Sequence, residues 1–170
     1  MTINVGVLTV SDRGCRGERV DQSGPALSAW LETHGAEVQV AALVADEVAQ
    51  IEARLREWVA NPDLDLILTT GGTGVSPRDV TPDATLRIIE RELPGFAEAM
   101  RAYSLSKTPM AMISRAVAGI CAGKLIINLP GSPQGAIENL EAVWAAVPHA
   151  LAKIQGDPRD CAHLIGNADA

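Results

Sequence analysis

The amino-acid sequence predicts an α/β fold, with a mostly parallel β-sheet, helices on both faces and one antiparallel strand. Short aliphatic, β-branched runs alternate with longer amphipathic segments along the chain, which is the pattern of βαβ units. Glycine and proline residues separate the segments. Near residue 120, the turn Cys121-Ala122-Gly123 joins two apolar runs and is too short for a crossover helix, so one strand should be antiparallel.

The strands are expected where apolar runs are bounded by polar, glycine or proline residues. They are residues 5–10, 37–44, 64–69, 117–120 and 124–128.

The helices are expected where apolar residues recur with helical spacing. These segments are residues 25–35, 46–59, 81–93, 96–105 and 137–151. Pro25 suits a first helical turn that Gly35 later closes, and Thr81 before Pro82 is typical of a cap followed by proline. Pro148 is expected to kink the last helix near its end.

Composition limits the possible functions. The 170 residues suit one domain, taken as residues 1–156, followed by a polar tail at residues 157–170. The formal net charge of −7 argues against general nucleic-acid binding. No apolar stretch approaches the ~20 residues of a membrane span, and the start lacks a signal peptide, which favours a cytoplasmic protein. Cys15, Cys121 and Cys161 are isolated and are expected to be free thiols.

Three loops should form the ligand-binding edge, because open α/β sheets bind ligands beyond the carboxyl ends of their strands. They are residues 11–24, 70–81 and 129–135. The segment Thr70-Gly71-Gly72-Thr73-Gly74 lets backbone N–H groups turn toward an oxyanion. It is neither a Walker loop nor a dinucleotide fingerprint, because no Gly-Lys-Ser/Thr follows and Pro77 replaces the last glycine. A plain tight turn is the alternative.

Two aspartates are candidate Mg²⁺ ligands, because Mg²⁺ is usually held by one or two carboxylates together with substrate phosphates. Asp79 follows the glycine-rich loop, and Asp46 follows the second strand. The alternatives are a loop cap or salt bridge for Asp79 and a helix N-cap for Asp46.

Other polar residues at this edge have two interpretations each. Ser11, Asp12 and Arg13 either face an anion or form a solvated loop. Ser132 before Pro133 predicts a helix N-cap, either as an anion site or as a simple capped turn. Arg115, after Ser114, reaches either an anion or a carboxylate. The three histidines, His34, His149 and His163, are scattered and favour no catalytic role.

Taken together, these motifs resemble the molybdopterin adenylyltransferase family. The main one is Leu68-Thr69-Thr70-Gly71-Gly72-Thr73-Gly74 followed by Arg78-Asp79-Val80-Thr81-Pro82. The flanking motifs are Thr9-Val10-Ser11-Asp12-Arg13 with Asp21 and Gly24, Pro94-Gly95-Phe96, Ser114-Arg115, and Asn128-Leu129-Pro130-Gly131-Ser132-Pro133. The resemblance extends over residues 5–154.

The resemblance implies a three-layer α/β/α sandwich, a homotrimer, and transfer of an adenylyl group from Mg-ATP to molybdopterin with release of pyrophosphate. A molybdenum insertase would be the downstream partner. The family's two essential aspartates correspond to Asp46 and Asp79, as catalytic residues and metal ligands. The implied substrate-binding residues are Ser11, Asp12, Arg13, Thr70, Gly71, Gly72, Thr73, Gly74, Ser114, Arg115, Asn128, Leu129, Pro130, Gly131 and Ser132.

Three alternatives stay open from the sequence. The first is a non-catalytic molybdopterin-binding paralogue or carrier of the same fold. The second is a scaffolding trimer, against which the lack of a linker within the chain argues. The third is a nicotinamide enzyme, which the failed dinucleotide fingerprint disfavours.

Overall fold

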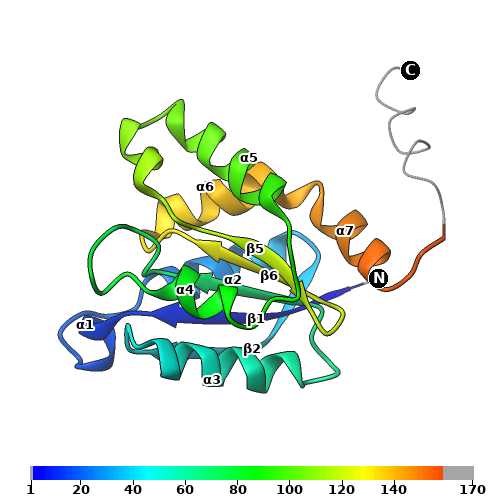
Figure 1. Cartoon of the computed structure of the whole chain (residues 1–170), viewed down its shortest axis with the longest axis horizontal. Coiled ribbons are helices and arrows are strands. Elements are labelled where there is room, and N and C mark those ends of the chain that lie inside the picture. The colour runs from blue at the N-terminus through cyan, green and yellow to red at the C-terminus, as the bar shows by residue number, and fades with distance from the viewer. Residues whose placement is uncertain (1, 159–170) are drawn as a thin grey trace.

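A six-stranded mixed sheet forms the middle of the protein in the computed structural model, which describes residues 2–158 (Figure 1). The strand order is β2-β1-β3-β6-β5-β4. Pairs β1–β2, β1–β3 and β3–β6 are parallel, whereas β5 runs antiparallel to both β6 and β4. The strands are β1 (Ile3–Val10), β2 (Ala36–Val44), β3 (Leu66–Thr70), β4 (Arg91–Glu92), β5 (Ala118–Cys121) and β6 (Lys124–Leu129).

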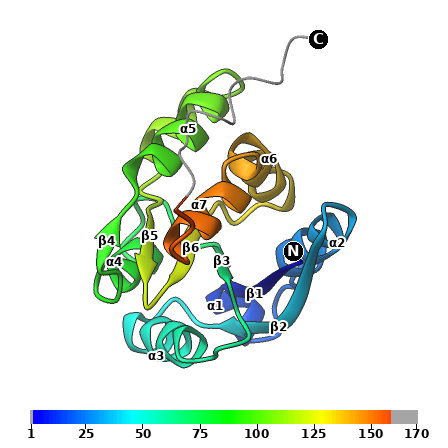
Figure 2. The ribbon, with the colours of Figure 1, turned by 90° about the vertical axis from the view of Figure 1, so that its right-hand side faces the viewer.

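Helices cover both faces of the sheet (Figure 2). One face packs against α2 (Ser23–Thr33), α5 (Pro94–Leu105), α6 (Pro133–Trp144) and α7 (Val147–Ile154). The other packs against α3 (Val48–Val59) and α4 (Thr81–Leu86). Two short elements, α1 (Asp12–Cys15) and the 3₁₀ helix η1 (Pro109–Ile113), lie in connections. The predicted three-layer sandwich with one antiparallel strand is confirmed.

The two aliphatic cores follow from the alternation of side chains along the central strands. In β1, Val5 and Val7 belong to the core under α2 and α6, whereas Leu8 belongs to the core under α3. In β3, Leu68 belongs to the core under α2 and α6, and Ile67 belongs to the core under α3. Central strands of a parallel sheet are buried on both faces, so they are apolar throughout.

The segment after Thr81 differs from the prediction. The expected helix to residue 93 ends at Leu86, whose side chain is 48% exposed. Glu90 N then donates to Ile120 O at 2.8 Å, and Leu93 N donates to Ala118 O at 2.8 Å. Backbone pairing with β5 therefore takes the place of further helix and forms the short strand β4. The helical spacing of apolar residues in this segment did not predict that strand.

Helix boundaries were predicted correctly in part. Gly35 follows α2 with φ +77°, and Ser132 Oγ caps α6 by accepting from Gly135 N. Asp46 does not cap α3, whose N-cap is Glu47 without a side-chain hydrogen bond. The expected single last helix is two helices, with Pro148 in the first turn of α7 instead of at a kink.

Among the described residues, no helix is long and apolar enough to cross a membrane. Cys15 and Cys121 are free thiols, as expected, while Cys161, His163 and most of the predicted tail lie outside the described residues.

Candidate active site

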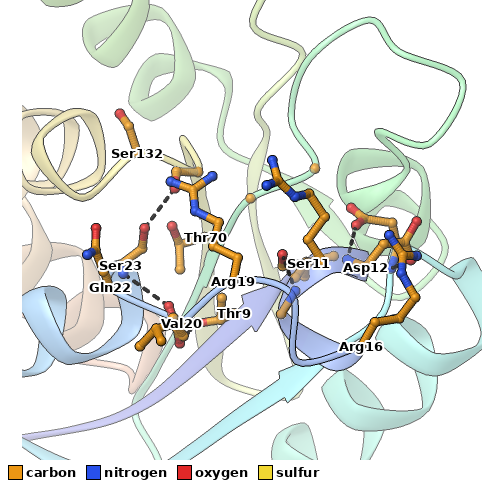
Figure 3. A pocket seen from close by; sticks show the side chains of 18 of the residues that line it. Thr9, Ser11, Asp12, Arg16, Arg19, Val20, Gln22, Ser23, Thr70 and Ser132 are labelled. Carbon is orange, nitrogen blue, oxygen red and sulfur yellow. Dashed lines mark hydrogen bonds between the residues drawn. The ribbon is translucent and has the colours of Figure 1, made fainter.

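A cavity of about 460 Å³ opens where the carboxyl ends of β1, β3 and β6 meet (Figure 3). All three loops predicted from the sheet topology contribute to its walls, together with the loop after β2. In Figure 3, Asp12 and Arg16 lie on one side, Gln22, Ser23 and Ser132 on the other, and Arg19 between them. The cavity is therefore built from segments that are far apart in the sequence.

The glycine-rich loop requires glycine for conformation and for space. Gly71 and Gly72 have φ values of +102° and +64°, which disfavour other residues. A Cβ atom at Gly71 would lie 2.3 Å from Val10 O. Thr81 Oγ1 donates to Gly71 O at 2.8 Å, which ties the loop to the start of α4.

Not all amides of this loop are available to a ligand. Gly71 N donates to Leu129 O at 3.2 Å and is already bonded. Among residues 2–158, the amides of Gly72, Thr73 and Gly74 have no protein acceptor. An oxyanion would therefore be bound by residues 72–74 and not by the whole segment.

Asp46 and Asp79 both lie close to the glycine-rich loop. A Cβ atom at Gly72 would be 3.0 Å from Asp46 Oδ1, and one at Gly74 would be 2.9 Å from Asp79 Oδ2. Burial raises the pKa of the Asp46 carboxyl, which also accepts a backbone hydrogen bond and feels the negative charges of Asp12 and Asp79. The structure thus brings the two predicted aspartates into electrostatic contact.

Asp12 connects to Asp46 by two reciprocal hydrogen bonds. Asp12 N donates to Asp46 Oδ2 at 2.7 Å, and Asp46 N donates to Asp12 Oδ1 at 3.0 Å. Arg78 binds the Asp12 carboxylate through Nε and Nη2, and this pairing is the largest factor that lowers the pKa of Asp12. Asp12 is therefore ionised and fixed in place.

Three arginines from the loop after β1 line the cavity. Arg16 forms an ion pair with Glu18 at 2.8 Å. For Arg13 and Arg19, no side-chain hydrogen bond or ion pair exists within residues 2–158. In a chain of net charge −7, two guanidinium groups without such partners in one cavity favour an anionic ligand.

The remaining wall is held by hydroxyl groups. Ser23 Oγ donates to Gly131 O and Thr70 Oγ1 donates to Pro130 O, both at 2.7 Å. Asp21 precedes the N-cap residue Gln22 and accepts from the backbone amides of Ser23 and Gly24 in the first turn of α2. The Ser23 bond joins the loop after β1 to the loop after β6, and the Thr70 bond joins the end of β3 to that same loop.

The two aspartates suit Mg²⁺ that is shared with substrate phosphates. No group of three or more His, Cys, Asp or Glu side chains arranged to hold a metal occurs in the described part of the chain. Mg²⁺ does not need such a cage, because it usually keeps several waters and takes one or two carboxylates plus phosphate oxygens. Asp46 and Asp79 supply that donor set.

The structure separates the predicted site residues into three groups. The cavity is lined by Ser11, Asp12, Arg13, Asp46, Thr70, Gly71, Gly72, Asp79, Gly131 and Ser132. A second cavity of about 270 Å³ is lined by Thr73, Gly74, Ser114 and Pro130, and again by Ser132. Asn128, Leu129 and Arg115 line neither of these cavities.

The residues outside both cavities have internal contacts. Asn128 is fully buried and its Nδ2 donates to the hydroxyl groups of Thr69 and Thr85. Arg115 donates to Asp79 O at 3.1 Å and forms an ion pair with Asp83. Asn128 thus holds β3 to α4 and Arg115 bonds to the backbone of Asp79, and the predicted contact of both residues with substrate stays a prediction.

Sequence reasoning did not single out Arg16, Arg19, Gln22 and Ser23, which line the first cavity. A signal was present, because Arg13, Arg16 and Arg19 recur every third residue in a loop assigned to the ligand-binding edge.

Comparison with known proteins identifies the family. A family model described as a probable molybdopterin-binding domain matches residues 6–149. The chain belongs to this family. The chain is 43% identical to the molybdopterin adenylyltransferase of Haemophilus influenzae, with 91% of this chain and 85% of that protein covered. It is 42% identical to the enzyme of the same name from Escherichia coli K12, with 91% and 87% covered.

Solved structures of the family have the same fold. The molybdopterin biosynthesis enzyme MoaB from Thermus thermophilus is 52% identical and superposes with a TM-score of 0.86 over 94% of this chain and all of that chain. The family assignment and the fold therefore agree.

Proposed function

We propose that the protein is a molybdopterin adenylyltransferase, which transfers the adenylyl group of ATP to the phosphate of molybdopterin and releases pyrophosphate. One observation carries the proposal. In a chain about 43% identical to curated enzymes of that name, Asp46 and Asp79 face one glycine loop in a cavity that also holds Arg13 and Arg19. Carboxylates for Mg²⁺ and guanidinium groups for phosphates are what a nucleotidyl transfer site needs.

The reaction needs positioning and charge neutralisation more than covalent catalysis. The substrate phosphate is itself the nucleophile that attacks the α-phosphorus, so no side-chain nucleophile is required. Asp46 and Asp79 would hold Mg²⁺, which when bound draws negative charge from the phosphate oxygens. The Gly72 amide, which has no protein acceptor within the described residues, binds an oxyanion in the first cavity, where Arg13 and Arg19 neutralise the phosphates and the departing pyrophosphate.

Three further features extend the proposal. A cytoplasmic location, a homotrimer and delivery of the product to a molybdenum insertase are expected of such an enzyme. Sedimentation equilibrium of the purified protein measures the trimer, and pull-down of a molybdenum insertase with adenylylated molybdopterin present measures the partner.

The decisive experiment measures pyrophosphate release from Mg-ATP with and without molybdopterin. We expect release that depends on molybdopterin, and we expect Asp79→Asn to lower turnover about 10²-fold or more while its far-UV circular dichroism stays unchanged. The asparagine can still accept from Ser76 N, which now donates to Asp79 Oδ2 at 2.8 Å. Molybdopterin binding without pyrophosphate release would select the non-catalytic carrier instead, and a near-wild-type rate in Asp79→Asn would reject the role of Asp79.

A further inference from the structure

Arg78 joins the loop that carries Asp79 to the loops that carry Asp12 and Asp46. Its Nε donates to Asp12 Oδ2 at 2.9 Å and its Nη2 to Asp12 Oδ1 at 3.0 Å. Nη2 also lies 2.8 Å from Glu47 Oε1. Within the described residues, no other hydrogen bond or ion pair connects residues 71–80 with residues 11–12 or 45–47. Arg78 therefore provides the polar connection across this side of the cavity.

Asp12 is in turn hydrogen-bonded to Asp46. The carboxylate that receives Arg78 also accepts from Asp46 N, and Asp12 N donates back to Asp46 Oδ2. A displacement of Asp12 would therefore move both the backbone and the carboxylate of Asp46. The four residues Asp12, Asp46, Arg78 and Asp79 thus behave as one unit, which we call the aspartate clasp.

The clasp works against a repulsion. Asp46 and Asp79 carry like charges against the same glycine-rich loop. Arg115 donates to Asp79 O, but among the described residues Arg78 is the cation that bonds the loop of Asp79 to the loops of Asp12 and Asp46. Like charges at one site favour separation of the segments that carry them. A guanidinium group fixed by two parallel hydrogen bonds opposes that separation and also sets its geometry.

Arg78 does not line the 460 Å³ cavity, although the residue after it does. Its donors are directed to Asp12 and Glu47, so it reaches the reaction through other residues and not by contact with a nucleotide.

We infer that Arg78 and Asp12 are positioning residues that hold Asp46 and Asp79 at the spacing needed to share a divalent cation with nucleotide phosphates. This inference rests on the proposed function. It assigns to Arg78 a role in cation affinity, distinct from the substrate contacts proposed for Arg13 and Arg19.

The test measures Mn²⁺ binding to the full chain by electron paramagnetic resonance, in the presence of a non-hydrolysable ATP analogue. We expect Arg78→Gln to weaken Mn²⁺ binding about 2- to 5-fold, because the loss of a partly exposed ion pair corresponds to a factor of up to about five. Arg78→Lys should give a smaller loss, because an ammonium group keeps the charge without the planar pair of donors. Arg54→Gln is the matched control, since Arg54 pairs with the exposed Glu57 on α3 at 2.7 Å.

A double-mutant cycle shows whether Asp12 acts through Arg78. Asp12→Asn combined with Arg78→Gln should weaken Mn²⁺ binding by less than the product of the two single effects. Unchanged Mn²⁺ affinity in a folded Arg78→Gln variant would overturn the inference. So would weaker binding of the ATP analogue without any change in Mn²⁺ affinity, because Arg78 would then be a nucleotide ligand.

Measuring Mn²⁺ binding and pyrophosphate release separately also distinguishes failure of this inference from failure of the proposed function. If the wild-type protein binds Mn²⁺ with the analogue and Arg78→Gln weakens that binding, the clasp stands even where molybdopterin elicits no pyrophosphate release. If the wild-type protein releases pyrophosphate and Arg78→Gln binds Mn²⁺ normally, the adenylyltransferase function is supported and the positioning role of Arg78 is rejected.

Discussion

Gly72→Ala tests whether the glycine loop needs space as well as conformational freedom. Gly72 has φ +64°, and a Cβ atom there would lie 2.4 Å from Thr81 Oγ1 and 3.0 Å from Asp46 Oδ1. The added methyl group must displace the Thr81 hydroxyl, which donates to Gly71 O at 2.8 Å in the buried interior of the loop. It must also shift the carboxylate of Asp46.

Two contributions give the expected loss of stability. A non-glycine residue in the left-handed region costs about 1 kcal/mol. Loss of the buried Thr81 hydrogen bond adds about 1–2 kcal/mol, because a buried carbonyl loses its partner. The sum of about 2–3 kcal/mol corresponds to a decrease in melting temperature of about 4–12 °C for a chain of this size.

Gly35→Ala is the matched control, because Gly35 has φ +77° with no atom within 4 Å of the added Cβ. It should lower the melting temperature by only about 2–4 °C, from conformational strain alone. Differential scanning calorimetry measures both variants, and pyrophosphate release measured well below the melting temperatures should fall more than about 10-fold in Gly72→Ala only. Equal melting temperatures for the two variants, with normal activity in Gly72→Ala, would refute the reasoning.

Three further variants test individual residues of the site. Arg19→Gln should raise KM for the anionic substrate about 5- to 10-fold with little change in kcat, and an unchanged KM in steady-state assays at low salt would exclude Arg19 from ligand binding. Asn128→Ala should lower the free energy of unfolding by about 2–3 kcal/mol, because Val117 N, Thr69 and Thr85 lose a buried partner; a urea midpoint equal to that of the wild type would contradict this. Asp46→Asn should raise the melting temperature of the metal-free protein at pH 7. Burial, with the charges of Asp12 and Asp79, raises the pKa of the Asp46 carboxyl, so its ionised form destabilises the folded state. That penalty is present above the raised pKa and is lost as the pH falls through it toward 3.8, so the gain in melting temperature should disappear at acidic pH; a gain independent of pH would show another cause.

The order of elements and the ligand-binding edge were accessible from the sequence, because both depend on local pattern. Aliphatic runs such as residues 64–69 are buried on both faces in any doubly covered sheet, so their composition reveals them. The turn at residues 121–123 is too short for a crossover, so it fixed the antiparallel strand. The parallel arrangement then placed three polar loops at one edge without knowledge of their contacts.

The helix boundaries show where local pattern was insufficient. The leucines after Thr81 have helical spacing, yet the chain leaves the helix at Leu86 because Glu90 and Leu93 find backbone partners in β5. Asp46 follows a strand as an N-cap would, yet its carboxylate accepts from Asp12 N, 34 residues away. In both places a long-range hydrogen bond competed with a local preference.

By itself, the sequence determined the fold class, the three loops and the residue types available there, since strand composition and glycine content act locally. Only the tertiary structure decided which of those residues meet. It placed Asp46 and Asp79 against one glycine-rich loop, directed Asn128 into the core, joined Arg78 to Asp12 across 66 positions, and left Arg13 and Arg19 facing the cavity. The physical reason is that burial, charge coupling and hydrogen-bond partners depend on distances between segments, which exist only after the sheet has brought the strand ends together.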